Sequence, residues 1–223
     1  MTLRPLFPDR AFAAFLFDMD GTILSSIAAA ERVWSRWARR HGLDVEAFLP
    51  TMHGKRGVDT ISQLNLPGID VQAEADWVTQ AEIEDVAGIR PIAHAAAFLA
   101  SLPPERWTIV TSSPLPLAKR RLEVAGLPIP SRIVTAEDIT RGKPAPDGFL
   151  LAAERLGFAP RECLVFEDAP AGIAAGEAAG ANVVVITATH THPIDTRHST
   201  VPSFEGLSVQ VNASGLLELL TAG

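Results

Sequence analysis

The sequence of 223 residues contains a single cysteine, Cys163. An intrachain disulfide is therefore excluded, and so low a cysteine content is typical of a reducing compartment. We accordingly expect a cytoplasmic protein. Cys163 lies inside an apolar run, which predicts a buried and inert thiol.

Long apolar runs are also lacking. The longest ones, such as residues 11–17 and 183–186, are far shorter than the ~20 residues that a membrane-spanning helix needs. Asp9 and Arg10 precede the first run, Asp18 follows it, and no small-residue cleavage site is present. We therefore expect neither a membrane span nor a signal peptide.

Basic residues are few, since 19 Lys and Arg face 26 Asp and Glu, for a net charge of −7. This balance argues against a nucleic-acid surface, which would be basic. It still allows a small anionic substrate, because a few cations and a metal ion can dominate a local site. Only three lysines occur, Lys55, Lys119 and Lys143. A lysine in such an arginine-rich chain favours a position that requires a compact ammonium group.

Apolar residues make up 47% of the chain, enough for a sizeable core. Short apolar runs without alternation predict buried parallel strands at residues 13–17, 107–110, 163–166 and 182–186. Two weaker runs predict a fifth strand at 132–134 and a late edge strand at 207–211, followed by a closing helix. Helices with proline near the first turn and glycine after the last are predicted at 116–125, 146–156 and 170–179. This alternation predicts a doubly wound, mostly parallel α/β sheet.

One long interval breaks the alternation. More than eighty residues separate the first strand from residue 107, and their pattern predicts helices at 27–41, 44–49, 57–64 and 71–86. A connection of this length should carry structure of its own. We expect an α/β core at 1–24 and 96–223 and an inserted helical cap at 25–95, with Trp34 and Trp37 packed inside the cap.

Polar residues follow the predicted strands directly. In open α/β sheets, ligands bind outside the carboxyl ends of the strands, so these side chains should converge in one crevice. They are Asp18, Asp20, Thr111, Ser112, Glu167 and Asp168, together with Lys143 before a predicted helix.

The types of these residues indicate phosphoryl transfer. Several carboxylates do not crowd together without a cation, and oxygen ligands with open positions suit Mg²⁺. A carboxylate such as Asp18 can attack phosphorus to form an acyl phosphate. Asp20, two residues on, can reach the leaving oxygen. Thr111 and Lys143 can stabilise charge on the transferring oxygens.

The same residues, in this order, resemble the four motifs of the haloacid dehalogenase superfamily. The motifs are Asp18-Met19-Asp20-Gly21-Thr22 after Phe17, then Thr111, then Gly142-Lys143-Pro144, then Glu167-Asp168. The helical insertion resembles the small helical cap of that superfamily. Residues 34–43, 53–56, 107–114 and 167–173 further resemble the sugar and polyol phosphate phosphatases, a group that includes 2-deoxyglucose-6-phosphate and glycerol-phosphate phosphatases. The resemblance extends to about residue 190.

This resemblance implies hydrolysis of a small sugar or polyol phosphate monoester, with Mg²⁺, through an aspartyl-phosphate intermediate. Asp18 would be the nucleophile and a metal ligand, and Asp20 the general acid and base, with its backbone carbonyl on the metal. Asp168 would complete the metal site, and Glu167 would act as a ligand or through a water.

The phosphoryl oxygens would be held by three side chains: Thr111, Ser112 and Lys143. Ser112 departs from the family pattern, which often has asparagine there. Two of them also allow a purely structural interpretation, since Thr111 could cap the following helix and Lys143 could lie on the surface.

Residues outside the core motifs allow two interpretations. His53, Lys55 and Arg56 in the cap form either a solvated basic turn or a loop that reaches over the substrate. His190 and His192 suggest a metal, but no third ligand lies near them in the sequence, which favours a polar loop.

Three other functions are alternatives to a phosphatase. A phosphomutase of the same superfamily shares every core residue and would show isomerisation activated by a bisphosphate. A dehalogenase would leave Asp20 and the metal pair without a role. A non-catalytic binding module would be expected to have lost a motif residue.

The oligomeric state is left open by the sequence, since no segment marks a self-association surface.

Overall fold

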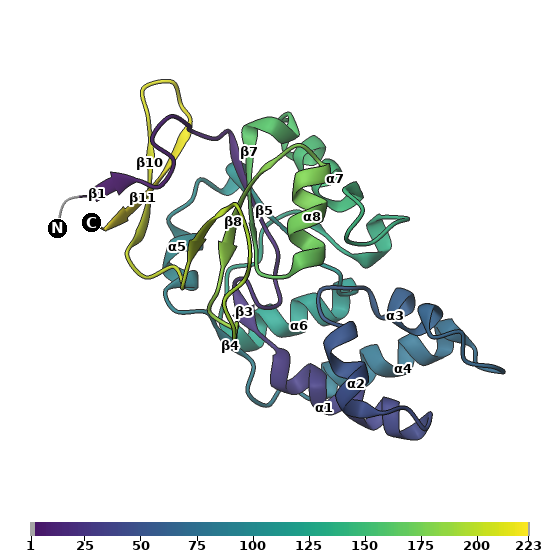
Figure 1. Ribbon diagram of the computed structural model, residues 1–223. Coiled ribbons are helices and arrows are strands. Elements are labelled where there is room, and N and C mark those ends of the chain that lie inside the picture. The colour runs from purple at the N-terminus through teal and green to yellow at the C-terminus, as the bar shows by residue number, and fades with distance from the viewer. Residues whose placement is uncertain (1–2, 223) are drawn as a thin grey trace.

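The computed structural model describes residues 3–222 and is built around a six-stranded parallel sheet of order β6-β5-β2-β7-β8-β9 (Figure 1). The strand of this sheet that comes first in the chain is central, since β2 pairs in parallel with β5 on one side and with β7 on the other. The sheet confirms the predicted fold class. Its strands are β2 (Ala14–Phe17), β5 (Trp107–Val110), β6 (Ile133–Val134), β7 (Cys163–Glu167), β8 (Asn182–Ile186) and β9 (Ser199–Val201).

Helices cover both faces of this sheet because side chains alternate along each strand. Leu16 of β2 packs with Phe149 of α7 (Asp147–Leu156) and Ile173 of α8 (Pro170–Ala178). Phe17 points to the other face and packs with residues of α5 (Ala95–Ala100) and α6 (Leu115–Ala125). Cys163, at the start of β7, is fully buried as predicted. Short 3-10 helices occupy Leu49–Thr51, Pro104–Arg106, Ala136–Asp138 and Pro160–Glu162.

Four helices after β2 form a separate group beside the sheet (Figure 1). They are α1 (Ile27–Arg40), α2 (Val45–Phe48), α3 (Gly57–Gln63) and α4 (Val71–Glu84). Trp34 and Trp37 pack in a hydrophobic cluster of this group, as the sequence predicted. Two short antiparallel strands, β3 (Leu24–Ser25) and β4 (Arg90–Pro91), lie where the chain enters and leaves it. The domain boundaries at 25–95 stay a prediction, which this pairing supports. We call residues 25–95 the helical segment below.

The C-terminal part differs from the prediction. Residues 207–211 form β10 (Leu207–Val211), but this strand lies at the edge of a second, antiparallel sheet with β11 (Leu217–Ala222) and β1 (Leu3–Pro5). The predicted closing helix is wrong. Leu217 and Leu219 alternate toward the core, and Asn212 accepts hydrogen bonds from two backbone N–H groups of the connecting turn, so the segment forms a hairpin.

The short strands β1, β3, β4 and β9 were not predicted either. Their two or three residues are too few for a hydrophobic period to be seen. Within residues 3–222, every helix is too short or too polar to cross a lipid bilayer.

Candidate active site

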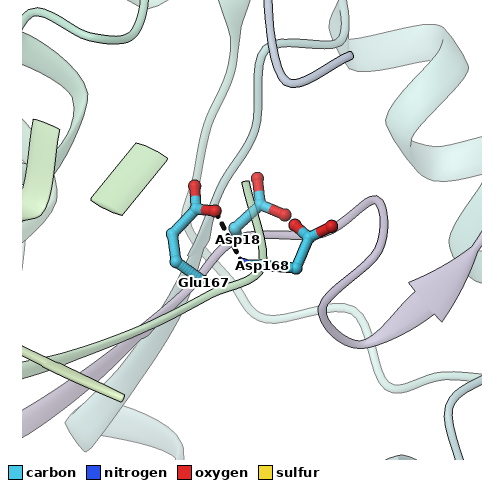
Figure 2. Close-up of side chains that lie close together, drawn as sticks. All are labelled: Asp18, Glu167 and Asp168. Atoms are coloured by element: carbon cyan, nitrogen blue, oxygen red, sulfur yellow. Dashed lines mark hydrogen bonds between the residues drawn. The ribbon is translucent and has the colours of Figure 1, made fainter. Parts of the chain in front are cut away.

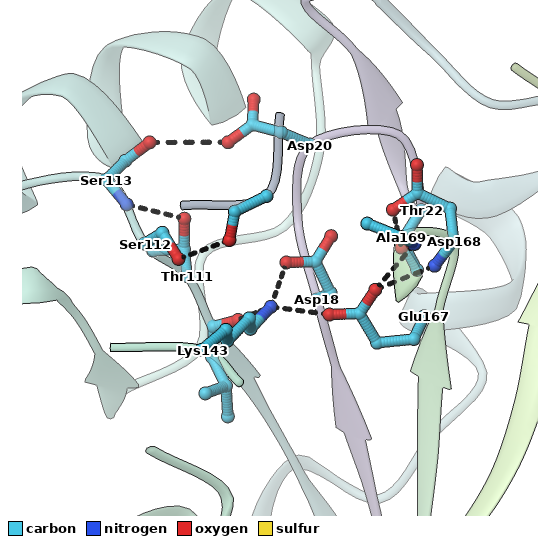
Figure 3. Close-up of polar contacts among 12 residues, drawn as sticks. Asp18, Asp20, Thr22, Thr111, Ser112, Ser113, Lys143, Glu167, Asp168 and Ala169 are labelled. Carbon is cyan, nitrogen blue, oxygen red and sulfur yellow. Dashed lines mark hydrogen bonds and ion pairs between the residues drawn. The ribbon is translucent and has the colours of Figure 1, made fainter. Parts of the chain in front are cut away.

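The residues predicted at the strand ends lie together at one edge of the parallel sheet (Figure 3). Asp18 follows β2, Thr111 follows β5, and Glu167 is the last residue of β7. These three strands are neighbours in the sheet, so their carboxyl ends meet. Lys143 reaches the same place from the loop before α7.

Lys143 is the cation at the centre of the site. Its Nζ lies 2.5 Å from Oδ1 of Asp18 and 2.6 Å from Oε1 of Glu167, with the carbonyl of Val110 at 3.5 Å. Burial lowers the pKa of Lys143, but the two carboxylates raise it more, so its pKa stands above the ordinary value. The two carboxylates thus favour the protonated ammonium form of this side chain.

Glu167 has both carboxylate oxygens engaged. Oε1 accepts from Lys143, and Oε2 accepts from the backbone N–H groups of Asp168 at 2.8 Å and Ala169 at 3.0 Å. These N–H groups immediately precede helix α8, where a negative charge is favoured. Glu167 thus joins the central lysine to the start of this helix.

A cluster of three carboxylates could hold a metal ion (Figure 2). Oxygens of Asp18, Glu167 and Asp168 lie within 4.8 Å of one another. Oδ2 of Asp18 is buried and receives no hydrogen bond from any residue in the range 3–222. Such an oxygen is left for a metal ion or for a substrate atom, because a buried carboxylate oxygen otherwise needs a donor.

The electrostatics of the three carboxylates also favour a bound cation. Burial and, to a smaller extent, the charge of Glu167 raise the pKa of Asp18 to about 7, although the charge of Lys143 lowers it in part. Burial and the charges of Glu167 and Asp18 raise the pKa of Asp168 well above its ordinary value. Its Oδ1 is held by the hydroxyl of Thr22 at 3.2 Å. A divalent cation would offset this repulsion.

Asp20 lies apart from the carboxylate cluster and has its own set of donors. Its Oδ1 accepts from Ser26 at 2.6 Å and from Arg121 at 2.9 Å, and its Oδ2 accepts from Ser113 at 3.3 Å. The carboxyl group is therefore held from the helical segment by Ser26 and from the core by the other two residues.

The side chains of the two predicted hydroxyl residues line the same pocket as Asp18 but differ in their contacts. Thr111 is buried, and its Oγ1 accepts from the backbone N–H of Ser113 at 3.1 Å. Ser112 donates to the carbonyl of Gly54 in the helical segment at 3.0 Å. Ser112 thus connects the sheet edge to the loop that carries His53 and Lys55.

A pocket of about 800 Å³ lies between the sheet edge and the helical segment. Its volume suits a small metabolite. The core contributes Asp18, Asp20 and Thr111, and the helical segment contributes polar and apolar side chains from α1, α4 and the loop before α3.

The three basic residues predicted in the helical segment line this pocket with different partners. His53 Nε2 lies 3.5 Å from a carboxylate oxygen of Glu31, and Lys55 Nζ lies 3.4 Å from Oε1 of Gln63. Arg56 donates to Asp59 and to the carbonyls of Ile139 and Thr140 in the core. These contacts make Arg56 a link between the two parts. Its role in substrate binding stays a prediction, as do those of His53 and Lys55.

His190 and His192 also line the pocket. A ring nitrogen of His190 lies 2.8 Å from the carbonyl of Asp168, which makes this histidine a support of the loop after β7. Among residues 3–222, neither histidine belongs to a group of three metal-ligating side chains. The polar-loop interpretation of these two histidines stays a prediction.

Two further charged residues near the site, Arg121 and Glu82, were not predicted from the sequence. Arg121 is 5% exposed and Glu82 is 8% exposed. The sequence does contain a sign of their burial, because helical spacing places each of these charged residues on the apolar face of its helix. Arg121 follows Leu117 by four residues and Glu82 follows Val78 by four.

Comparison with known proteins agrees with this arrangement. The sequence model of haloacid dehalogenase-like hydrolases matches residues 12–180. Hexitol phosphatase A of Escherichia coli is 45% identical over 186 residues, which cover 82% of this chain and 84% of that protein. Glycerol-1-phosphate phosphohydrolase 1 of Saccharomyces cerevisiae is 33% identical over 207 residues, covering 85% of this chain and 79% of that protein.

Among solved structures, β-phosphoglucomutase from Clostridium difficile is similar with a TM-score of 0.72 and 20% identity. The match covers 86% of this chain and 91% of that chain. At this identity the likeness concerns the fold alone. The family match spans more than half of the chain, and the four motifs lie together in space. The chain therefore belongs to the haloacid dehalogenase-like hydrolases.

Proposed function

We propose that this chain is a magnesium-dependent phosphatase of small sugar or polyol phosphates, and that Asp18 is the residue that becomes phosphorylated. The environment of Asp18 carries the proposal. One oxygen accepts from Lys143, whereas Oδ2 lacks a donor within residues 3–222, and the side chain lines the pocket. Such an oxygen is available for attack on phosphorus. The names of the hexitol and glycerol-phosphate relatives support the substrate class.

In the first half of the proposed reaction, a carboxylate oxygen of Asp18 attacks phosphorus and the bond from phosphorus to the ester oxygen breaks. Asp20 donates a proton to the leaving oxygen, so that the sugar or polyol departs as an alcohol. Lys143, Thr111 and Ser112 stabilise the charge on the phosphoryl oxygens.

In the second half, the carboxylate of Asp20 removes a proton from a water molecule that attacks the phosphorus atom. The bond between phosphorus and Asp18 breaks, and inorganic phosphate is released. Asp20 ends this half protonated and ready for the next substrate.

The fit of the carboxylates to a metal suggests how Mg²⁺ would be held. Asp18 and Asp168 would bind it together with the backbone carbonyl of Asp20. Glu167, whose oxygens are both engaged, would act through a water or through Lys143. When bound, Mg²⁺ neutralises the crowded carboxylates and the charge that develops on the phosphoryl group.

The experiment that tests the function is phosphate release from hexitol, glycerol, hexose and pentose phosphates, with Mg²⁺ and with a chelator. We expect Mg²⁺-dependent release, strongest for one sugar or polyol class. A phosphomutase would instead isomerise a hexose phosphate in the presence of a bisphosphate and release little phosphate. Absence of release by a folded, Mg²⁺-loaded protein would overturn the proposal.

Mg²⁺ is expected to raise the melting temperature more at about pH 8 than at about pH 5, because a metal binds only the deprotonated carboxylates. Without metal, the raised pKa of Asp18 favours folding below its ordinary value of 3.8, and this contribution is lost as the pH rises through about 7. Mg²⁺ at ten times its Kd would add ~1.4 kcal/mol, or about 3–6 °C. Thermal melting with Mg²⁺ or EDTA across this range measures the difference.

The matched control for this measurement is Asp168→Asn, which removes one charge from the cluster and keeps its shape. The Mg²⁺-dependent shift should shrink in this variant at every pH. An equal shift at both pH values, or an undiminished shift in Asp168→Asn, would contradict the proposed metal site.

Lys55→Ala is expected to change the ratio of kcat/KM values within the substrate panel. Lys55 lines the pocket, and its nearest partner, Gln63, is 3.4 Å away, so its ammonium group is available to a substrate. Loss of a hydrogen bond to a charged group, worth about 1.5–3 kcal/mol, would cost the preferred substrate about tenfold or more. Lys119→Ala, at an exposed position, is the control. An unchanged profile would make Lys55 part of a solvated turn.

A further inference from the structure

Arg121 on α6 binds two carboxylates with the two ends of one guanidinium group. Its Nη1 donates to Oδ1 of Asp20 at 2.9 Å, and its Nη2 donates to Oε1 of Glu82 at 3.0 Å. Asp20 belongs to the active site, whereas Glu82 lies on α4 in the helical segment. The arginine therefore bridges the two parts of the chain at the site itself.

The bridge is buried and geometrically restrictive. Arg121 and Glu82 are both more than nine-tenths buried. Buried carboxylates require a cation, and the guanidinium is a planar group that fixes the directions of its hydrogen bonds. Burial raises the pKa of Glu82, and the charge of Arg121 opposes this. Glu82 and Asp20 in turn leave the guanidinium little freedom to rotate.

The orientation of the Asp20 carboxyl group depends on this bridge. Besides its direct bond, Arg121 Nη1 donates to the hydroxyl of Ser113 at 3.1 Å, and that hydroxyl reaches Oδ2 of Asp20 at 3.3 Å. Ser26 also donates to Oδ1, at 2.6 Å. Donors on both oxygens hold the plane of the carboxyl group, and Arg121 takes part in two of these contacts.

We propose that Arg121, held by Glu82, is a positioning residue that orients Asp20 for proton donation to the leaving oxygen. This inference rests on the proposed function. Because Glu82 lies on α4 and Arg121 on α6, the orientation of Asp20 would also depend on how α4 packs against α6. In this positioning role Arg121 contacts neither phosphorus nor the leaving group.

Substrates with different leaving groups can distinguish a positioning role of Arg121 from a merely structural one. When Asp18 attacks an alkyl phosphate, the bond from phosphorus to the ester oxygen breaks, and the proton of Asp20 passes to the departing alkoxide. When it attacks p-nitrophenyl phosphate, the nitrophenolate departs without a proton. Since kcat/KM includes only the steps up to the departure of the leaving group, a misplaced Asp20 should penalise the alkyl substrate selectively.

The test compares Arg121→Lys and Glu82→Gln with the wild type and with Arg120→Lys, which changes the exposed neighbouring arginine. Lysine keeps the buried charge but does not bind both carboxylates in a fixed fork. The substrates are p-nitrophenyl phosphate and the sugar or polyol phosphate that the wild type hydrolyses fastest. Circular dichroism confirms that each variant is folded.

For Arg121→Lys we expect kcat/KM on the alkyl substrate to fall by about 10²-fold, the usual cost of a misplaced catalytic group, and to fall at least about tenfold less on p-nitrophenyl phosphate. Glu82→Gln should show the same selectivity with a smaller loss, and Arg120→Lys should match the wild type. Equal losses on both substrates, or no loss in either variant, would overturn the inference while the proposed function stands. Failure of the wild type to release phosphate from any substrate would overturn both.

Discussion

Replacing Asp18 with asparagine is expected to abolish phosphate release, with kcat falling at least about 10⁴-fold, as when other enzymes lose their nucleophile. The amide has nearly the shape of the carboxylate and can still accept the hydrogen bond from Lys143 at Oδ1. It replaces the oxygen that lacks a donor with an NH₂ group, which is no nucleophile. Release of phosphate from the best substrate of the panel measures the loss.

The same substitution should preserve the fold or strengthen it. Burial and the charge of Glu167 raise the pKa of Asp18 to about 7, so its carboxylate form destabilises the metal-free protein above that pH. A neutral asparagine removes this cost, although it weakens the contact with Lys143. We expect the melting temperature in EDTA at about pH 8 to be equal to or above that of the wild type.

Two controls make the result on Asp18 decisive. Mass spectrometry of Asp18→Asn excludes deamidation back to aspartate, and acid quenching of the wild type during turnover should trap phosphate on Asp18. Substantial turnover by an intact Asp18→Asn protein would contradict the covalent mechanism, whatever the substrate.

The core of the fold could be predicted from sequence because its strands are buried on both faces. A strand such as β7 shows a continuous apolar run, and the following Glu167 marks where the run reaches the sheet edge. Strand ends in a parallel sheet share one edge, so the convergence of Asp18, Thr111 and Glu167 followed from their order. The distances between these side chains and Lys143 could not be predicted, because they depend on the conformation of the loops.

The C-terminal hairpin and the bridge through Arg121 could not be predicted in the same way. Residues 217–222 contain four apolar side chains in six positions, a pattern compatible with helix or strand until the partner strand is known. Arg121 and Glu82 lie 39 residues apart in sequence, one in the core and the other in the helical segment. An arginine on an apolar helix face indicates a buried partner, but only the tertiary structure identifies that partner.

Gly172→Ala is expected to reduce activity by at least about 10²-fold, since a misplaced group near the reacting atoms commonly costs that much. Gly172 lies in α8, where alanine would normally stabilise the helix by about 1 kcal/mol. A Cβ at this position, however, would lie 1.5 Å from Oε1 of Glu167 and 2.0 Å from its carboxyl carbon. The carboxylate would have to move, which breaks its contacts with Lys143 and the start of α8.

The cost to stability should be of the size seen when a buried ion pair loses one partner, about 3–5 kcal/mol, or a fall in melting temperature of about 6–20 °C. Gly176→Ala, one turn further along α8, is the matched control, because its Cβ would meet Val183 at 3.0 Å and no charged group. It tests packing alone, so its activity should stay near that of the wild type. If Gly172→Ala were as active as Gly176→Ala, the Glu167 carboxylate would not be what holds Lys143 beside Asp18, and the lysine would have to be positioned by the Asp18 contact alone.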